Sequence, residues 1–186
     1  NKLNRKFDII ECAGVLHHMK EPVEGLKVLL DILEPHGFLK LGLYSELARE
    51  HIVKTKELIN KRKLKNTNED IKNFRQDVIN EVRDPFLKKT AACMEFYSTS
   101  SVRDLLFHVQ EHRFTIPQIS KILTDLDLEF LGFYCPNPFV KKEFSKLFPN
   151  DQKNISLNNW HEFEKKNPDI FANMYQFYVK KNHVHK

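Results

Sequence analysis

The opening forty-five residues constrain the fold of this chain more than any other part of its sequence. A mostly apolar run, 7–12, ends at Ala13-Gly14 and has the pattern of a buried, central strand of the parallel type. Pro22 begins an amphipathic helix that ends before Pro35-His36-Gly37, and 38–44 forms a second strand. A strand, a helix and a strand joined by short connections predict a βαβ unit, and therefore a chain of the α/β class.

The rest of the chain alternates between helical and sheet-forming stretches. From Glu46 to about Gln118 the strand patterns disappear and amphipathic helices are predicted, one of them starting at a capping box at Thr115. Strand patterns return at 128–134 and 174–179, separated by a predicted helix at 138–148 and a polar loop rich in Asn. In the last strand alternate residues should face opposite sides of a sheet.

Composition excludes several classes of protein. Hydrophobic residues make up 41% of the 186, enough for a core, and no apolar stretch approaches the roughly 18 residues that a spanning helix needs. The start is basic, but the apolar run that follows it is interrupted by Asp8 and Glu11, so it does not resemble a secretory signal. Three widely spaced cysteines suit neither a zinc site nor a disulfide framework. We expect a protein of the cytoplasm with no membrane segment.

A net charge of +5 raises the question whether the chain binds nucleic acid. The basic excess is concentrated between Lys54 and Lys65, where a solvated helix face is the simpler interpretation. Trp160 and the 15 phenylalanines read as core residues and not as a base-stacking surface. We therefore do not expect a nucleic-acid-binding protein.

Two segments carry a resemblance to a known family. Residues 7–22, FDIIECAGVLHHMKEP, are followed by Leu33-Glu34-Pro35-His36-Gly37. They resemble the FDxIxxxxVLHHxxxP and LxPGG segments around the fourth and fifth strands of class I S-adenosylmethionine-dependent methyltransferases, with His36 in place of the first glycine. The stretch 101–115, together with Trp160, Phe163 and the pattern at 174–177, looks like a bacterial subgroup in which such a domain often follows tetratricopeptide repeats.

The resemblance implies a definite fold. The family has seven strands in the order 3-2-1-4-5-7-6, and the four strands predicted here correspond to strands four to seven. The chain is thus expected to be the C-terminal half of a Rossmann-like methyltransferase sheet, strands 4-5-7-6, with a helical insertion. Its single partial domain, 1–186, would consist of a βαβ core at 1–45, a helical insertion or cover at 46–127, and a C-terminal β-hairpin with an inserted helix at 128–186.

What this half lacks also has consequences. The family's glycine-rich cofactor turn and the acidic residue that binds the ribose lie in its first strands, and the five glycines here form no such cluster. We expect the chain to be part of a longer enzyme and to be inactive by itself. Its first strand, 7–12, would present an open edge through which copies of the chain can associate.

The candidate site lies where the first strand ends, because ligands bind at the carboxyl ends of the strands in open parallel sheets. If the resemblance holds, the cofactor side is lined by Glu11, Cys12, Ala13, Leu16 and His17. Methyl transfer is a displacement that a protein accelerates mainly by positioning, with a base needed only when the acceptor carries a proton. His17 and His18 are the catalytic candidates. The alternatives are that Leu16 only packs in the core and that the His pair caps the next helix.

Substrate-binding candidates are Tyr44 after the second strand and four residues of the helical part, Arg103, His108, His112 and Arg113. Such residues would suit an anionic or polar acceptor, and a solvated helix face is the alternative. His108 and His112 also match the HxxEH spacing of some zinc proteases, but no third ligand is identifiable. We expect no metal.

The sequence therefore favours part of an S-adenosylmethionine-dependent methyltransferase whose methyl acceptor is unknown. A second interpretation is a non-enzymatic interaction module, a degenerate methyltransferase remnant. It would bind a protein or a polyanion through the basic helices around 46–65.

Overall fold

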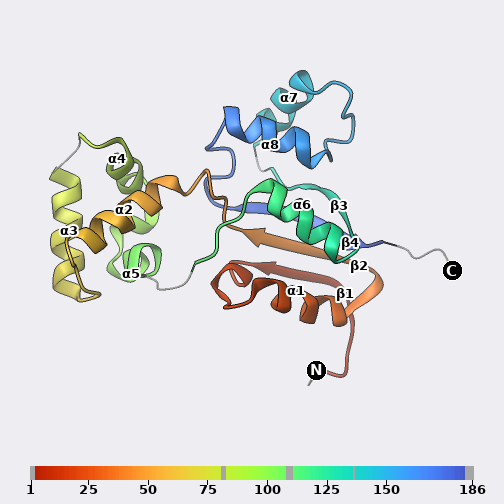
Figure 1. Ribbon diagram of the computed structural model, residues 1–186, viewed down its shortest axis with the longest axis horizontal. Helices are drawn as coiled ribbons and strands as arrows, with labels where there is room; N and C mark the ends of the chain where they lie inside the picture. Colours follow the sequence, from red (N-terminus) through yellow and green to blue (C-terminus); the bar gives the residue numbers. More distant parts are fainter. Residues whose placement is uncertain (1–2, 81–82, 108–110, 136, 183–186) are drawn as a thin grey trace. The chain divides into compact units, whose positions relative to one another are not determined.

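The structure is a computed structural model that describes residues 3–80, 83–107, 111–135 and 137–182 (Figure 1). The chain divides into two compact units. The first unit is made of residues 1–48 and 110–186, and the second of residues 49–109. Each is described by itself.

The first unit is of the α/β type. Its elements are β1 (Phe7–Ala13), a 3-10 turn (Leu16–His18), α1 (Pro22–Asp31), β2 (Leu33–Leu43), α6 (Ile116–Asp125), β3 (Leu128–Phe133), α7 (Pro138–Leu147), α8 (Leu157–Lys166) and β4 (Tyr175–Lys181). The sheet has the order β1-β2-β4-β3. β1 pairs with β2 in parallel, whereas β4 runs antiparallel to both of its neighbours. This is the predicted order 4-5-7-6, which is confirmed.

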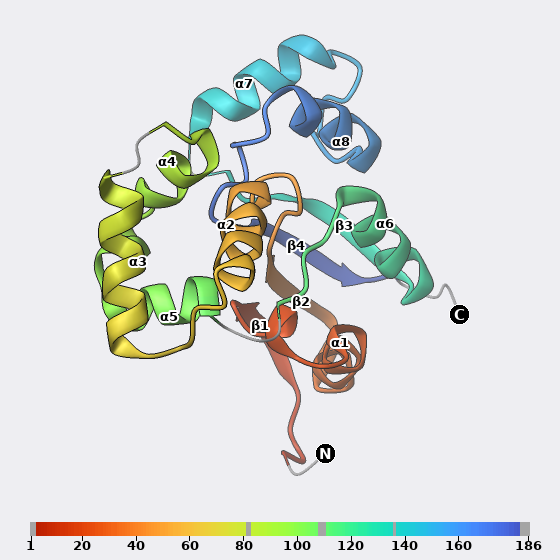
Figure 2. The same cartoon turned by 60° about the vertical axis from the view of Figure 1, so that its left-hand side comes forward.

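One face of the sheet carries the core of this unit. Leu39 and Leu41 of β2 lie opposite Val179 and Phe177 of β4, and all four are buried. α1 and α6 cover this same face (Figures 1 and 2). Aromatic side chains from β3, α7, α8 and the segment before β4 extend the core, with Trp160 stacked on Phe144 at 4.0 Å. The prediction that alternate residues of β4 face opposite sides is confirmed, because Tyr175, Phe177 and Val179 are buried and their neighbours are more exposed.

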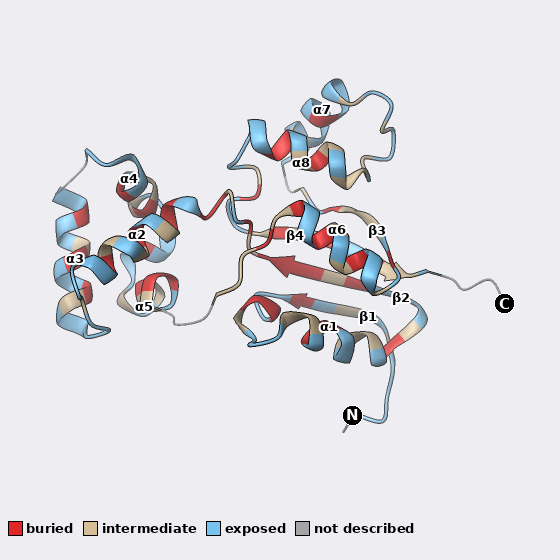
Figure 3. Ribbon diagram, viewed as in Figure 1, coloured by how far each residue is buried: buried red, intermediate tan, exposed pale blue. Residues whose placement is uncertain are grey.

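β1 differs from the buried central strand that its apolar sequence predicts. It lies at the edge of the sheet, and most of its residues are exposed (Figure 3). Cys12 is its one buried residue, and Ile9 is 72% exposed. The apolar pattern of 7–12 describes a strand with neighbours on both sides, and here β1 has a neighbour only on the β2 side. The edge is open, as expected for a half sheet.

Two further boundaries differ from the sequence expectation. β2 begins at Leu33 and not at 38, because Pro35-His36-Gly37 continues the extended chain instead of forming a turn. The Asn-rich segment expected to be a loop contains α8, whose start is capped by Ser156, which accepts a hydrogen bond from the backbone N–H of Asn159.

The second unit is helical. Its elements are α2 (Glu50–Lys61), α3 (Asn68–Asn80), α4 (Pro85–Ala91), a 3-10 turn (Met94–Tyr97) and α5 (Thr99–Phe107). They enclose a core of their own that includes Ile52, Phe74 and Phe96. The unit is shorter than the insertion expected at 46–127, because α6 packs against β3 and α8 of the first unit. None of the helices in the described residues is long and apolar enough to cross a membrane.

Candidate active site

The turn that leaves β1 is shaped by glycine. Gly14 has a φ of +76°, a left-handed conformation that glycine adopts at little cost, and open space lies where a side chain would start. The chain then forms the 3-10 turn at Leu16–His18. Leu16 is buried in the core with Leu26 of α1. Leu16 therefore anchors the turn in the core, and the space next to Gly14 is free of other residues.

Two imidazoles of this turn meet the phenol ring of Tyr44. The ring of His17 stacks on that of Tyr44, with centroids 3.8 Å apart and planes 29° apart. His18 lies edge-on to His17 at 4.4 Å and to Tyr44 at 6.0 Å. The sequence predicted roles for all three, and the structure brings them together at the carboxyl ends of the two parallel strands.

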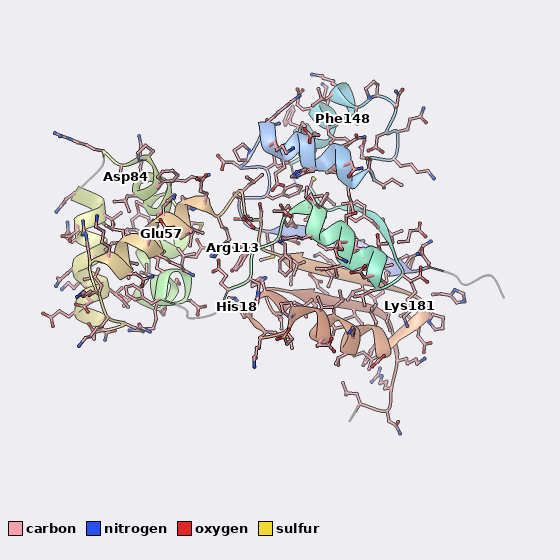
Figure 4. The ribbon with its side chains drawn as sticks, in the orientation of Figure 1. His18, Glu57, Asp84, Arg113, Phe148 and Lys181 are labelled. Carbon is pink, nitrogen blue, oxygen red and sulfur yellow. The ribbon has the colours of Figure 1, made fainter. Side chains whose placement is uncertain are left out.

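A short extended segment, 112–114, is bound to both of these strand ends. The backbone N–H of His112 donates to the carbonyl oxygen of His17 at 2.7 Å, and that of Phe114 donates to the carbonyl oxygen of Tyr44 at 2.9 Å. Arg113 lies between them, with its guanidinium 3.8 Å from the Glu111 carboxylate. His18 and Arg113 thus lie at the same end of the sheet, and Lys181 marks the opposite end (Figure 4).

The expected cofactor-side residues differ in accessibility. The side chains of Cys12, Leu16 and His17 are buried, and burial raises the pKa of the Cys12 thiol, which therefore stays protonated at neutral pH. Ala13 and Glu11 are exposed, and the Glu11 carboxylate pairs with Lys40 at 2.7 Å. That hydrogen bond raises the pKa of Lys40. Next to the strand end, the exposed residues are Ala13, Gly14 and Val15, and Gly14 and Val15 were not among the predicted site residues.

The substrate-side candidates are distributed over both units. Tyr44, His112 and Arg113 belong to the first unit together with His17. Arg103 belongs to the second, where its guanidinium donates hydrogen bonds to the side-chain oxygens of Asn66 and Asn68 at 2.7 and 2.6 Å. His108 lies outside the described residues.

A buried polar cluster that was not predicted from the sequence adjoins the site. Glu164 of α8 accepts hydrogen bonds from Ser45 and from Tyr175 of β4, and all three residues are fully buried. The signal that points to it is the placement of Glu164 on the apolar face of α8, four residues after Trp160 and next to Phe163.

The chemistry available at the site is that of the imidazole groups of His17 and His18 and the phenol group of Tyr44. Imidazole and phenol groups act as general acids and bases. Within the ranges that the structure describes, no cluster of three or more His, Cys, Asp or Glu side chains could hold a metal ion.

Comparisons with known proteins bear on the fold. No model of a known protein family matches the chain. Over 58 residues it is 41% identical to an uncharacterised protein of Synechococcus sp., syc1184_c, a stretch that makes up 31% of this chain and 14% of that protein. The solved structure of PKMT2 from Rickettsia typhi matches 99% of the chain with a TM-score of 0.74 and 15% identity. The chain has the fold of an S-adenosylmethionine-dependent methyltransferase.

A second PKMT2 structure, in complex with AdoHcy, matches this methyltransferase fold with a TM-score of 0.69 and 16% identity. In both comparisons the chain covers 37% of the PKMT2 chain. The chain therefore spans well under half the length of the proteins that it resembles, and the predicted resemblance in fold is confirmed.

Proposed function

We propose that this chain is part of an S-adenosylmethionine-dependent methyltransferase that transfers a methyl group to an acceptor not yet identified. The observation that carries the proposal is the match of 99% of the chain to part of PKMT2, a protein whose structure was also solved in complex with AdoHcy, the product left by S-adenosylmethionine. The three cysteines are free thiols, which suits a reducing cytoplasm.

A cofactor site at the turn after β1 is supported by the exposure of Ala13, Gly14 and Val15 and by the open space around Gly14. Bound there, S-adenosylmethionine would supply a methyl group on a sulfonium, ready for displacement. Glu11, Cys12 and Ala13 would line the cofactor site at the end of β1. The buried side chains of Leu16 and His17 would hold the turn in place. The protein's main contribution is to position the reactants.

The acceptor side would be formed by Tyr44, His112 and Arg113 of the first unit. His18, at the rim of the cluster, and His17 are the candidates to take a proton from an acceptor that carries one. A cationic Arg113 favours an acceptor with a polar or anionic group.

The test uses the full-length protein. Calorimetric titration with AdoHcy should give binding, and tritium from the methyl group of S-adenosylmethionine should appear in an acceptor from a cell extract. Ala13→Trp, which covers the exposed strand end, should weaken AdoHcy binding by about tenfold or more. Phe139→Trp, equally bulky and exposed on α7, should not. Unchanged affinity in a folded Ala13→Trp variant, or no AdoHcy binding by the full-length wild type, would overturn the proposal.

The 186 residues alone should bind S-adenosylmethionine weakly or not at all, since β1 has a neighbour on one side only and the resemblance places the glycine-rich turn in earlier strands. Calorimetry on this chain checks the expectation, and affinity equal to that of the full-length protein contradicts it.

The open edge of β1 supports self-association of the isolated chain. Its outer side offers unpaired backbone groups beside the exposed Ile9. Sedimentation should show a concentration-dependent dimer that Ile9→Lys weakens. A monomer at high concentration argues against it.

The alternative, an interaction module that binds a polyanion or a protein through basic helices, gains no support from the second unit. Arg62 pairs with Asp77 at 3.1 Å, and Lys54 lies 3.7 Å from Glu57, so part of the basic cluster is neutralised. Binding of heparin that weakens steeply with salt would revive it.

A further inference from the structure

The carboxyl group of Glu164 and the hydroxyls of Ser45 and Tyr175 form a hydrogen-bonded cluster next to the candidate site. Ser45 Oγ and Tyr175 Oη each donate to Glu164 Oε1 at 2.7 Å, and Tyr175 also lies 2.9 Å from Oε2. Ser45 Oγ in turn accepts the backbone N–H of Ala48 at 3.1 Å. The cluster joins the end of β2, the helix α8 and the start of β4.

Burying the carboxyl group of Glu164 and the two hydroxyls lowers the stability of the fold unless hydrogen bonds compensate for it. Burial raises the pKa of the Glu164 carboxyl, and the hydrogen bonds from Ser45 and Tyr175 oppose that shift only in part. Burial, reinforced by the nearby Glu164 charge, raises the pKa of Tyr175 far above its usual range, so its hydroxyl keeps its proton and donates it. Apolar residues of similar volume commonly stabilise a core at least as well as buried charged groups do. Stability alone therefore does not explain the cluster.

The position of Ser45 gives the cluster a second role. Ser45 follows Tyr44 directly, and successive side chains of an extended segment point to opposite sides. With Ser45 held inward by Glu164, the ring of Tyr44 is directed to the other side, where it stacks on His17. The backbone is extended here, because Ser45 also forms a β-bridge with Phe114.

We propose that Glu164 is a positioning residue that, through Ser45 and Tyr175, fixes the end of β2 so that Tyr44 stacks on His17. The stack, together with the hydrogen bond from His112 to the His17 carbonyl, holds the 3-10 turn next to the exposed Ala13-Gly14-Val15. The consequence for methyl transfer rests on the proposed function, whereas the geometric statement does not.

The geometry is tested by NMR on this chain. The stacked Tyr44 ring should shift the Hε1 signal of His17 upfield, and Tyr44→Leu gives the position of that signal without the ring. Ser45→Ala and Glu164→Gln should move the signal most of the way to the Tyr44→Leu position. Thr115→Ala, which removes the helix cap of α6 in the same unit without touching the cluster, should leave it in place.

If Glu164→Gln does not fold, Ser45→Ala and Tyr175→Phe decide, because each removes one hydroxyl and leaves the other hydrogen bond to Glu164. A wild-type position of the His17 signal in folded Ser45→Ala and Tyr175→Phe overturns the proposal. In the full-length enzyme, Ser45→Ala should lower kcat by about tenfold or more with little change in AdoHcy affinity. Unchanged kcat beside a shifted NMR signal leaves the geometry intact and removes its role in catalysis. Absence of AdoHcy binding by the wild type refutes the proposed function separately.

Discussion

A carboxyl group buried as deeply as Glu164 makes the stability of the first unit depend on pH. Burial raises its pKa above the ordinary 4.5. Between pH 4.5 and the pKa of the native state, the folded state therefore binds more protons than the unfolded state. The free energy of unfolding should therefore fall as pH rises through this window, and stay level above the native pKa.

Urea unfolding from about pH 4 to about pH 7, followed by the fluorescence of the single Trp160, measures this dependence. Glu164→Gln cannot titrate, so the difference between wild type and variant isolates the contribution of Glu164. Parallel curves for the two proteins would show that Glu164 titrates alike in both states.

Gly42 is required by the close approach of β1 and β2. A Cβ at this position would lie 2.7 Å from Cβ of Ala13 and 2.7 Å from the sulfur of Met174. Ala13 is fixed by the paired backbone of β1, so Gly42→Ala should cost about 1–3 kcal/mol of unfolding free energy. Adding Ala13→Gly should restore part of that loss, as a double-mutant cycle of urea unfolding would reveal. Full additivity of the two changes would mean that the strain comes from Met174 and from the Cα of Ala13, which would lie 2.9 Å from the new Cβ.

At this scale the sequence predicted local neighbours better than distant ones. His17, His18 and Tyr44 could be placed at strand ends because each lies at the end of a strand pattern or within a few residues of it. The hydrogen bond of Glu164 to Ser45 spans 119 residues, and no local pattern determines it. Which of the site residues are buried depends on packing that the sequence pattern does not encode, and Leu16 and His17 are examples.

Among the elements, α6 has the most explicit start. Thr115 accepts a hydrogen bond from the backbone N–H of Gln118, whose side chain accepts one from the backbone N–H of Thr115, as the sequence predicted. Thr115→Ala should lower the unfolding free energy by about 1 kcal/mol, measured by urea denaturation. Thr115→Ser retains the hydroxyl and should lose much less. Equal losses for both would assign the effect to the methyl group of Thr115.

The elements that the sequence misplaced share a cause. α8 starts at Leu157 in a stretch of Asn residues with low helix propensity, and burial of Trp160 and Phe163 outweighs that propensity. β2 extends back through a proline because Phe7 of β1 pairs with Leu33. In both cases tertiary contacts override the local preference of the chain.

Over the whole chain, the two units have separate cores. The two clusters of buried residues identified within the described ranges each lie inside one unit. Phe74→Ala, which removes a large side chain from the helical core, should cost about 3–5 kcal/mol, enough to unfold a small unit.

That change should lower the helical signal in circular dichroism while the Trp160 fluorescence transition stays in place. Leu39→Ala, in the sheet, should instead shift the Trp160 transition. If Phe74→Ala moves both signals together, the units unfold as one and the separation fails.

The strand order of the whole sheet was predicted through the family resemblance and not from periodicity. Four strand patterns admit many orders, and the βαβ rule fixes only that β1 and β2 run in the same direction. The position of β1 at an edge depends on which other strands are present in the sheet. No sequence pattern within 7–12 determines this.

The bridge between Ser45 and Phe114, with the backbone N–H of Glu46 donating to the Phe114 carbonyl at 2.9 Å, brings together the points where the chain departs into 49–109 and returns from it. An insert whose ends meet in this way can lengthen, shorten or be exchanged during evolution while the strands beneath keep their register. Such a junction allows the helical unit to vary without rebuilding the sheet.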